Sequence, residues 1–258
     1  KVLFAPESSV FELVGPSVYE SEGIWESMRI PEELIPVAKG MTFEYVDADG
    51  SVKLCNNHNA LTDATPELKS GWDVVVGKMS RGSIVVNGDV HLILTDDCEL
   101  TATGGGNFAG VAVEPGNSLV IYGQRNGTGK LTATGGWNAA GIGGQNPNYL
   151  SELGNYGTIT INGGTVTAMG GENGAGIGGG YKGKNGAVAI NGGRLKVVAG
   201  NGASVIGAGE DGISQGTVAI SGGIFTWKPN EEWLVDQSLK FFDNPDASTC
   251  ADYPWAVV

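Results

Sequence analysis

The chain contains 258 residues and carries a formal charge of −13, from 15 basic and 28 acidic residues. This acidic balance argues against nucleic acid and anionic membranes as partners. Glycine is abundant, with 44 residues, but an apolar content of 41% excludes a collagen-like or disordered chain. No apolar run is long enough to span a bilayer, so we expect no membrane insertion.

The first part of the chain differs from the rest. Residues 1–45 contain no repeat, and we expect them to form an N-terminal cap or the tail of a preceding domain. Tyr45–Leu54 alternates around Asp49-Gly50, which predicts a β-hairpin with these two residues at its turn. Asp47 and Asp49 are spaced like the start of a calcium loop, but no Glu stands at the twelfth position. A turn is therefore favoured, and we predict no metal site.

A similar segment recurs along most of the remaining chain. Its copies start 29, 40, 29 and 30 residues apart, at Asp89, Ser118, Thr158, Ala187 and Thr217. Self-similarity at such a period is typical of solenoids, in which each unit can bury its apolar face only against its neighbours. Trp72–Val76 and Ser83–Val86 resemble an imperfect first turn. We predict the solenoid over residues 46–229.

Each repeat contains three short strands, separated by corners rich in Gly and Asn. In the copy that starts at residue 158, the strands are Thr158–Ile161, Thr165–Met169 and Ala175–Ile177. Three strands in a turn of about 29 residues predict an all-β fold, specifically a right-handed parallel β-helix. A β-sandwich is the alternative, but it does not explain such equal spacing.

The corners and the C-terminal end complete the predicted architecture. Asn162 and Asn191 occupy equivalent corners, where we expect their side chains to hydrogen-bond to each other. Because an exposed solenoid end leaves a strand edge unpaired, residues 230–258 are expected to form a C-terminal cap. This cap is predicted to hold a short helix at Glu231–Leu239 and a closing strand or hairpin within Lys240–Val258.

The 40-residue step indicates an insertion, which we assign to Gly144–Tyr156. Insertions in solenoids map to loops and often to the binding face. Aromatic rings together with hydrogen-bonding groups are typical of a sugar site, whereas the alternative is a loop folded back on the coil. The ligand-binding residues expected at this corner and on the next turn are Gln145, Asn146, Asn148, Tyr149, Glu152, Tyr156, Tyr181 and Lys182.

Trp137 is a second candidate for contact with a sugar ring. It stands in a Gly-rich corner, at the position that Glu172 occupies in the next turn. A Trp in such a corner is expected to be exposed on one side. Packing beneath a neighbouring loop is the alternative.

Two sets of carboxylates are considered for catalysis. They are the acidic cluster Asp96, Asp97 and Glu99, and the corner residues Glu152, Glu210 and Asp211. A glycoside hydrolase needs two carboxyl groups on either side of one bond, and a lyase needs carboxylates for calcium and a basic residue. No basic residue is near the acidic cluster in sequence, and Asp is favoured at turns. We therefore predict no catalytic residues and no cofactor.

The remaining polar residues are assigned structural roles. Thr-x-Thr pairs occur at 101/103, 132/134 and 165/167, and a ladder of them would resemble the ice-facing side of some antifreeze proteins. Ordinary β-propensity is the preferred explanation. His58 and His91 have no partner that suggests a triad or a metal site. The three cysteines match no zinc pattern and are expected to be buried or unpaired thiols.

The stretches HLILTDDCELTATGG, AAGIGG and GTITINGGTVTAMGGENGAGIGGG resemble Gly-rich repeat regions of secreted surface proteins from gut-type anaerobic bacteria. The resemblance covers roughly residues 70–240 and rests on the repeat signature. Such proteins are often described as having carbohydrate-binding or parallel β-helix domains. The resemblance implies a secreted or cell-surface bacterial protein with carbohydrate as its partner. We expect a non-catalytic module that binds glycans or acts as an adhesin, and the alternatives are a hydrolase or lyase and a structural stalk.

Overall fold

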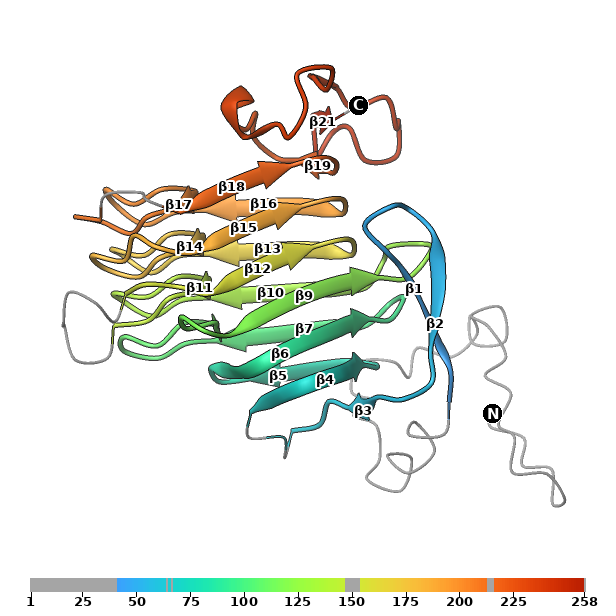
Figure 1. The fold of residues 1–258 in the computed structure, drawn as a ribbon, viewed down its shortest axis with the longest axis horizontal. Coiled ribbons are helices and arrows are strands. Elements are labelled where there is room, and N and C mark those ends of the chain that lie inside the picture. The colour runs from blue at the N-terminus through green and yellow to red at the C-terminus, as the bar shows by residue number, and fades with distance from the viewer. Residues whose placement is uncertain (1–40, 64, 66, 147–153, 213–215, 258) are drawn as a thin grey trace, which may run out of the picture.

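The computed structural model describes residues 41–63, 65, 67–146, 154–212 and 216–257. These residues form β-strands and one 3-10 turn, and none of them belongs to an α-helix. Parallel strands stack turn upon turn into a nearly closed, solenoid-like sheet (Figure 1). None of the described segments forms a helix long and apolar enough to cross a bilayer.

The coil contains three ladders of hydrogen-bonded parallel strands. The first ladder contains β3 (Asn59–Ala60), β4 (Leu68–Val75), β6 (Ile84–Leu94), β9 (Ser118–Gly123), β12 (Thr158–Ile161), β15 (Ala187–Ile190) and β18 (Thr217–Ile220). The second ladder contains β5 (Lys78–Arg81), β7 (Glu99–Thr103), β10 (Lys130–Thr134), β13 (Thr165–Met169), β16 (Arg194–Val198) and β19 (Ile224–Phe225). The third ladder starts at the beginning of β6 and continues through β8 (Val111–Ala112), β11 (Ile142–Gly143), β14 (Ile177–Gly178) and β17 (Ile206–Gly207).

The register of the first ladder agrees with the predicted repeat. Asp89, Ser118, Thr158, Ala187 and Thr217 are aligned from turn to turn. The predicted first turn is also confirmed, because β4 pairs in parallel with β6. Residues that share a sequence position in their repeats are therefore neighbours along the coil.

Alternation decides which side chains point into the coil. On β12, Ile159 and Ile161 are fully buried, whereas Thr158 is exposed. Their partners on β9, Leu119 and Ile121, are buried as well. Each such aliphatic side chain contributes about 1.5 to 3 kcal/mol when it is removed from water. One continuous core of stacked aliphatic rows therefore runs through the turns.

The corners between the first and second ladders form a hydrogen-bonded row of polar side chains. Asn191 Nδ2 donates to Asn162 Oδ1 at 2.8 Å, as predicted, and Ser221 Oγ donates to Asn191 Oδ1 at 2.8 Å. The glycine two positions after each of these residues has a positive φ, for example 80° at Gly164 and 92° at Gly193. The row therefore satisfies polar groups at a place where the chain turns sharply.

The extra residues of the 40-residue repeat between Ser118 and Thr158 are divided between two corners. The starts of β9 and β10 are 12 residues apart, against 7 for β12 and β13. The starts of β11 and β12 are 16 residues apart, against 10 for β14 and β15. Placing the whole insertion in Gly144–Tyr156 was therefore wrong in part, because the corner loop Gln124–Gly129 supplies the other extra residues.

A hairpin lies across the outside of the first ladder. It consists of β1 (Phe43–Val46) and β2 (Val52–Cys55), paired antiparallel, and Gly50 N donates to Asp47 O at 2.9 Å in the turn. The predicted hairpin and its turn are thus confirmed. The predicted boundary between residues 45 and 46 falls inside β1.

The hairpin covers a second apolar cluster on the outer face of the coil. Tyr45 packs against Trp72 and Tyr122, with ring centroids 4.7 Å and 4.8 Å away. Gln124 Nε2 donates to Glu44 O at 3.1 Å, so the corner loop Gln124–Gly129 holds one strand of the hairpin. In Figure 1 the hairpin crosses several turns along one edge of the coil.

The C-terminal segment closes one end of the coil. β20 (Phe241–Asp243) pairs with β21 (Trp255–Val257), which pairs antiparallel with β19 and so covers the edge of the second ladder. The predicted closing hairpin is confirmed. The predicted helix over Glu231–Leu239 was wrong in extent, because only a 3-10 turn forms at Glu231–Trp233, capped by Asn230.

The two cysteines in the coil and its hairpin, Cys55 and Cys98, are buried, and Cys250 is half-buried. All three are free thiols, as predicted. Burial raises the pKa of Cys98 to about 12, which keeps this thiol protonated and unreactive.

Three glycines on the third ladder, Gly143, Gly178 and Gly207, have a positive φ. Gly178 has a φ of 134°, and a Cβ built on it would overlap the carbonyl oxygen of Gly207 on the next turn. We expect Gly178→Ala to lower the free energy of unfolding by about 3 kcal/mol or more, from backbone strain and overpacking. Chemical denaturation of both proteins measures the difference.

The matched control is Gly82→Ala. Gly82 has open space around the position of a Cβ and no positive φ. Its substitution is expected to change stability by at most about 0.5 kcal/mol. Equal effects of the two substitutions would contradict the proposed close approach of the turns.

Asp73 is a carboxylic acid inside the coil. It lies on β4, on the same face as Val75, and only 3% of it is exposed. Its Oδ2 atom has no hydrogen-bond partner. Desolvation by burial raises the pKa of Asp73 to about 6, because the charged form is disfavoured away from water.

The raised pKa of Asp73 predicts a pH-dependent loss of stability. Below pH 4 the carboxyl is protonated in both states, and between about pH 4 and 6 only the folded state keeps the proton. The free energy of unfolding should therefore fall by about 3 kcal/mol as pH rises through this window, at about 1.4 kcal/mol per pKa unit.

Denaturation of Asp73→Asn at pH 4.5 and pH 7 tests this expectation. The variant should lose the pH-dependent difference, while Asp252→Asn, which removes an exposed carboxylate, should retain it. A difference that persists in Asp73→Asn would assign the effect to another group.

Candidate functional site

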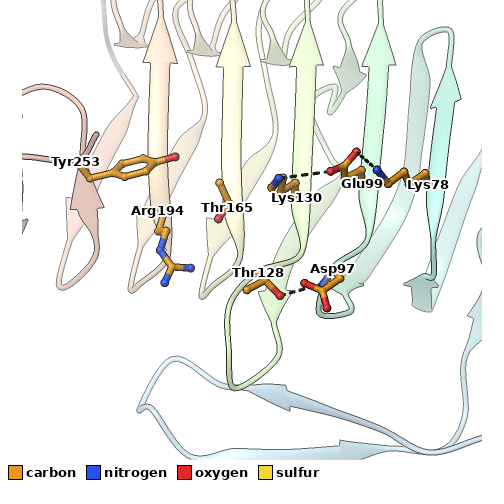
Figure 2. A pocket seen from close by; sticks show the side chains of 8 residues that line it. All are labelled: Lys78, Asp97, Glu99, Thr128, Lys130, Thr165, Arg194 and Tyr253. Carbon is orange, nitrogen blue, oxygen red and sulfur yellow. Dashed lines mark hydrogen bonds and ion pairs between the residues drawn. The ribbon is translucent and has the colours of Figure 1, made fainter. Parts of the chain in front are cut away.

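A cavity of about 500 Å³ opens on the outer side of the second ladder. Its floor is formed by the first residues of successive strands, which are stacked in register: Lys78, Glu99, Lys130, Thr165 and Arg194. Figure 2 shows these side chains side by side at the beginnings of five strands. The repeat itself therefore gathers residues that are widely separated in sequence.

Two corner loops and the C-terminal segment complete the wall of the cavity. Asp97 and Thr128 come from the loops that precede β7 and β10, and Tyr253 comes from the segment before β21 (Figure 2). The backbone N–H of Asp97 donates to Thr128 Oγ1 at 3.0 Å. Asp96 binds the longer loop, because its Oδ1 accepts hydrogen bonds from the backbone N–H and the hydroxyl of Thr128, both at 3.2 Å.

Opposite charges alternate along the floor of the cavity. Glu99 lies between two ammonium groups, with Lys78 Nζ at 3.3 Å and Lys130 Nζ at 3.4 Å. Desolvation acts to raise the pKa of Glu99, but its contacts with the two lysines outweigh desolvation and hold the pKa below its ordinary value. Glu99 is therefore ionised and paired, which makes it a poor general acid.

Arg194 and Tyr253 form the other end of the cavity. Arg194 donates through Nη1 to the carbonyl oxygen of Gly127 at 2.6 Å, which fixes the guanidinium against the corner loop. Thr165 Oγ1 donates to the same oxygen at 3.3 Å. Burial raises the pKa of Tyr253, an effect that the nearby Arg194 charge opposes, and the phenol stays protonated at neutral pH.

Trp137 lies on a different edge, at the corner between the second and third ladders. Its side chain is 62% exposed, and Phe108 on the preceding turn is 46% exposed. The backbones of these corners are in contact, because Gly136 N donates to Phe108 O at 2.9 Å. Two aromatic side chains on adjacent turns therefore face solvent, as the sequence predicted for Trp137.

A row of asparagine side chains supports this corner. Asn138 Nδ2 donates to Asn107 Oδ1 at 2.8 Å, and Asn173 Nδ2 donates to Asn138 Oδ1 at 2.6 Å. Asn138 directly follows Trp137 in the chain and is buried. The backbone that carries Trp137 is therefore held from both neighbouring turns.

Tyr181 and Lys182 lie beside the Trp137 corner. Tyr181 N donates to the carbonyl oxygen of Asn138 at 2.9 Å, and the Tyr181 hydroxyl donates to Asp211 Oδ2 at 3.1 Å. Lys182 Nζ is 5.0 Å from the centroid of the Tyr181 ring. The structure thus brings three of the predicted binding residues to one edge of the coil.

Three other predicted binding residues are turned inward, which corrects the expectation that they line an open groove. Gln145 Nε2 donates to Glu114 Oε1 at 3.0 Å, and Asn146 Nδ2 donates to the carbonyl oxygen of Tyr181 at 3.0 Å. Tyr156 is 2% exposed and belongs to the main core. These side chains complete the packing of the corner, so a ligand on the surface does not reach them.

The remaining residues predicted at this corner lie outside the described residues. They are Asn148, Tyr149 and Glu152. Of the carboxylates considered with Glu152, Glu210 is half-buried and Asp211 is exposed and accepts the hydrogen bond from Tyr181. The carboxylates of the other acidic cluster have different surroundings: Asp96 accepts hydrogen bonds from Thr128, whereas Asp97 and Glu99 line the cavity.

The histidines contribute to packing beneath the hairpin. His91 stacks on Trp72, with ring centroids 4.5 Å apart, and its Nδ1 lies 3.0 Å from the Tyr122 hydroxyl. His58 Nε2 lies 2.8 Å from the carbonyl oxygen of Met41. Within the described ranges, no three His, Cys, Asp or Glu side chains form a metal-binding group.

The Thr-x-Thr pairs do not form a continuous ladder, in agreement with the preferred explanation that they reflect ordinary β-propensity. Thr101, Thr132 and Thr167 stack in register, but Thr134 pairs with Met169. The third pair is offset by two positions, since β13 aligns Thr165 with Lys130. A continuous double row of hydroxyl groups is therefore not present on this face.

Sequence reasoning missed most of the cavity. Lys78, Lys130 and Arg194 each stand at the first position of the second strand in their repeats, and aligning the repeats on that strand reveals them. Tyr253 lies outside the repeat and leaves no such signal. The expectation that no basic residue is near Glu99 holds along the chain but not across turns.

Comparison with known proteins assigns the chain to no group. No family model, no curated protein and no solved structure matches it. The function must therefore be argued from the two surface sites, which are the cavity and the Trp137 corner.

The two ion pairs in the cavity predict that the pKa of Glu99 depends on Lys78 and Lys130. In a Lys78→Gln, Lys130→Gln variant both ion pairs are lost. The pKa of Glu99 should then rise relative to that in the parent chain, because the two positive charges that lower it are removed, as followed by NMR titration of its carboxyl carbon. Lys196→Gln, an exposed lysine on β16, is the control, and an unchanged Glu99 pKa in the double variant would contradict the pairing.

Proposed function

We propose that the chain is a right-handed parallel β-helix with three strands per turn, secreted or displayed on a bacterial cell surface, and that it binds glycans without catalysis. Three in-register ladders of parallel strands support this architecture. The resemblance of its repeats to bacterial surface proteins supports the location. Binding as an adhesin is the same proposal with the glycan on a neighbouring cell.

The exposure of Trp137 is the observation that carries the proposal. Leaving 62% of an indole in water forgoes the stabilisation that its burial would provide. Single exposed apolar residues are common, but Phe108 is also exposed, in the corner of the adjacent turn whose backbone is hydrogen-bonded to that of Gly136. An aromatic ring offers a flat apolar face to the C–H groups of a sugar ring.

Polar groups on the following turns would bind the hydroxyl groups of such a ligand. The Tyr181 backbone is hydrogen-bonded to Asn138, next to Trp137, and its hydroxyl and ring contact the Asp211 carboxylate and the Lys182 ammonium group. They provide both donors and acceptors for sugar hydroxyls. The Asn107–Asn138–Asn173 row holds the backbone there, so the site is formed before a ligand arrives.

The pKa values and contacts of the described carboxylates near the two sites favour binding over hydrolysis. A hydrolase needs one carboxyl group with a raised pKa that can donate a proton to the leaving group. Glu99 has a lowered pKa between two lysines, and Asp96 is engaged in holding the corner loop. Asp211 already accepts a hydrogen bond from Tyr181.

A glycan-array screen followed by affinity measurement tests the proposal. Trp137→Ala should weaken binding of each hit about tenfold or more, which corresponds to about 1.4 kcal/mol per factor of ten, as expected for an aromatic anchor. The matched control is Phe242→Ala, which removes another aromatic side chain that is 49% exposed, in the C-terminal cap.

Melting temperatures of both variants should stay close to that of the parent chain, because both side chains are largely exposed. If every hit binds Trp137→Ala and the parent chain equally well, the corner is not the binding site. Release of reducing ends or unsaturated products from a bound glycan would replace the binding proposal with the enzymatic alternative.

A further inference from the structure

We propose that the cavity on the second ladder is a separate site that recognises the carboxylate of an acidic saccharide, such as a uronic acid. This inference rests on the proposed function in so far as the ligand is a glycan. It concerns other residues than the Trp137 corner, and it names the chemical class that the cavity selects.

The residues that line the cavity carry a net charge opposite in sign to that of the chain. Three cations, Lys78, Lys130 and Arg194, stand against two carboxylates, Asp97 and Glu99, which leaves one positive charge among the lining residues. Asp96 lies next to this lining, where it accepts hydrogen bonds from Thr128. The whole chain carries −13. A cavity with a single excess positive charge in an acidic protein is suited to a ligand with one negative charge.

Arg194 is positioned to receive that charge. One of its guanidinium nitrogens is fixed by Gly127 at 2.6 Å, and the guanidinium has further N–H donors that this bond does not use. Arginine binds carboxylates through paired, charge-assisted hydrogen bonds, and anchoring the group beforehand reduces the entropy lost on binding. The Tyr253 side chain lines the same end of the cavity and carries a neutral hydroxyl.

The rest of the cavity fits sugar hydroxyls better than a second anionic group. Asp97 and Glu99 accept hydrogen bonds and repel anions, and Thr128 and Thr165 contribute hydroxyl groups. A phosphate or a multiply sulfated chain would bring further negative charge against the two carboxylates. The volume of about 500 Å³ lies within the range of sites that hold small molecules.

The cavity and the Trp137 corner lie at opposite ends of one strand. Lys130 is the first residue of β10, and Trp137 lies three residues beyond the last one, Thr134. At about 3.3 Å per residue, the four steps along β10 alone separate the two sites by about 13 Å. A variant at one site therefore leaves the side chains of the other in place.

Calorimetric titration of the whole chain with matched saccharides tests the inference. The acidic probes are galacturonic acid, a hyaluronan disaccharide and sialyllactose, each with one carboxylate, and the neutral counterparts are galactose, a chitin disaccharide and lactose. Inorganic phosphate and a sulfated disaccharide form a further arm. At least one acidic probe should bind more tightly than its neutral counterpart and more tightly than phosphate or the sulfated disaccharide.

Variants then place the acidic probe in the cavity. Arg194→Gln and Lys130→Gln should each weaken its binding, about 10- to 100-fold for Arg194→Gln, as expected for loss of a charge-assisted hydrogen bond. Lys196→Gln removes an exposed positive charge two residues further along β16 and should change little. The Lys130 side chain is 56% exposed, so Lys130→Gln remains informative if loss of the Arg194 bond to Gly127 impairs folding.

These titrations either support or overturn the inference. The inference is overturned if no acidic probe binds in preference to its neutral counterpart, if phosphate or the sulfated disaccharide binds more tightly, or if Lys130→Gln and Arg194→Gln bind as the parent chain does. Trp137→Ala separates the two proposals, because it should retain cavity binding. If neutral glycans bind Trp137→Ala as tightly as the parent chain, the proposed binding site at the Trp137 corner is refuted. If no acidic saccharide is preferred over its neutral counterpart, only the proposal for the cavity is refuted.

Discussion

The close approach of backbones along the third ladder is the constraint on which the rest of the structure depends. Gly143, Gly178 and Gly207 follow one another on the third ladder, and each of the first two carries its φ in a region that favours glycine. A Cβ on either residue would overlap the carbonyl oxygen of the next turn. Because these positions carry no Cβ, the backbone can turn there and still hydrogen-bond to the next turn, as Gly144 N does to Gly178 O at 2.7 Å and Gly179 N to Gly207 O at 2.7 Å.

The repeat spacing was sufficient to predict the stacked parallel strands, because equal steps place equivalent residues on top of one another. It also predicted the Asn162–Asn191 bond. It did not predict where an extra residue protrudes, since the spacing of repeat starts records only the total length of a turn. For the same reason the pattern could not show that Gln145, Asn146 and Tyr156 fold inward.

The two surface sites differ in how visible they are in sequence. A Trp in a Gly-rich corner is conspicuous alone, because few bulky residues are tolerated there, and Trp137 was identified in this way. The cavity consists of unremarkable residues, each common on a strand, which acquire meaning only when five turns are superposed and Tyr253 is added from the C-terminal segment. Alternating charges such as Lys78, Glu99 and Lys130 are recognisable only across turns.

The hairpin formed by β1 and β2 has a consequence for how the coil comes apart. A solenoid held only by neighbour contacts can peel from either end, one turn at a time. Here Tyr45 bridges turns that contain Trp72 and Tyr122, and Asn162 Nδ2 lies 3.5 Å from Asp47 Oδ1 on a later turn. The hairpin acts as a brace along the axis of the coil. Under mechanical load the braced turns must yield together, while the unbraced turns beyond β12 are free to separate in sequence.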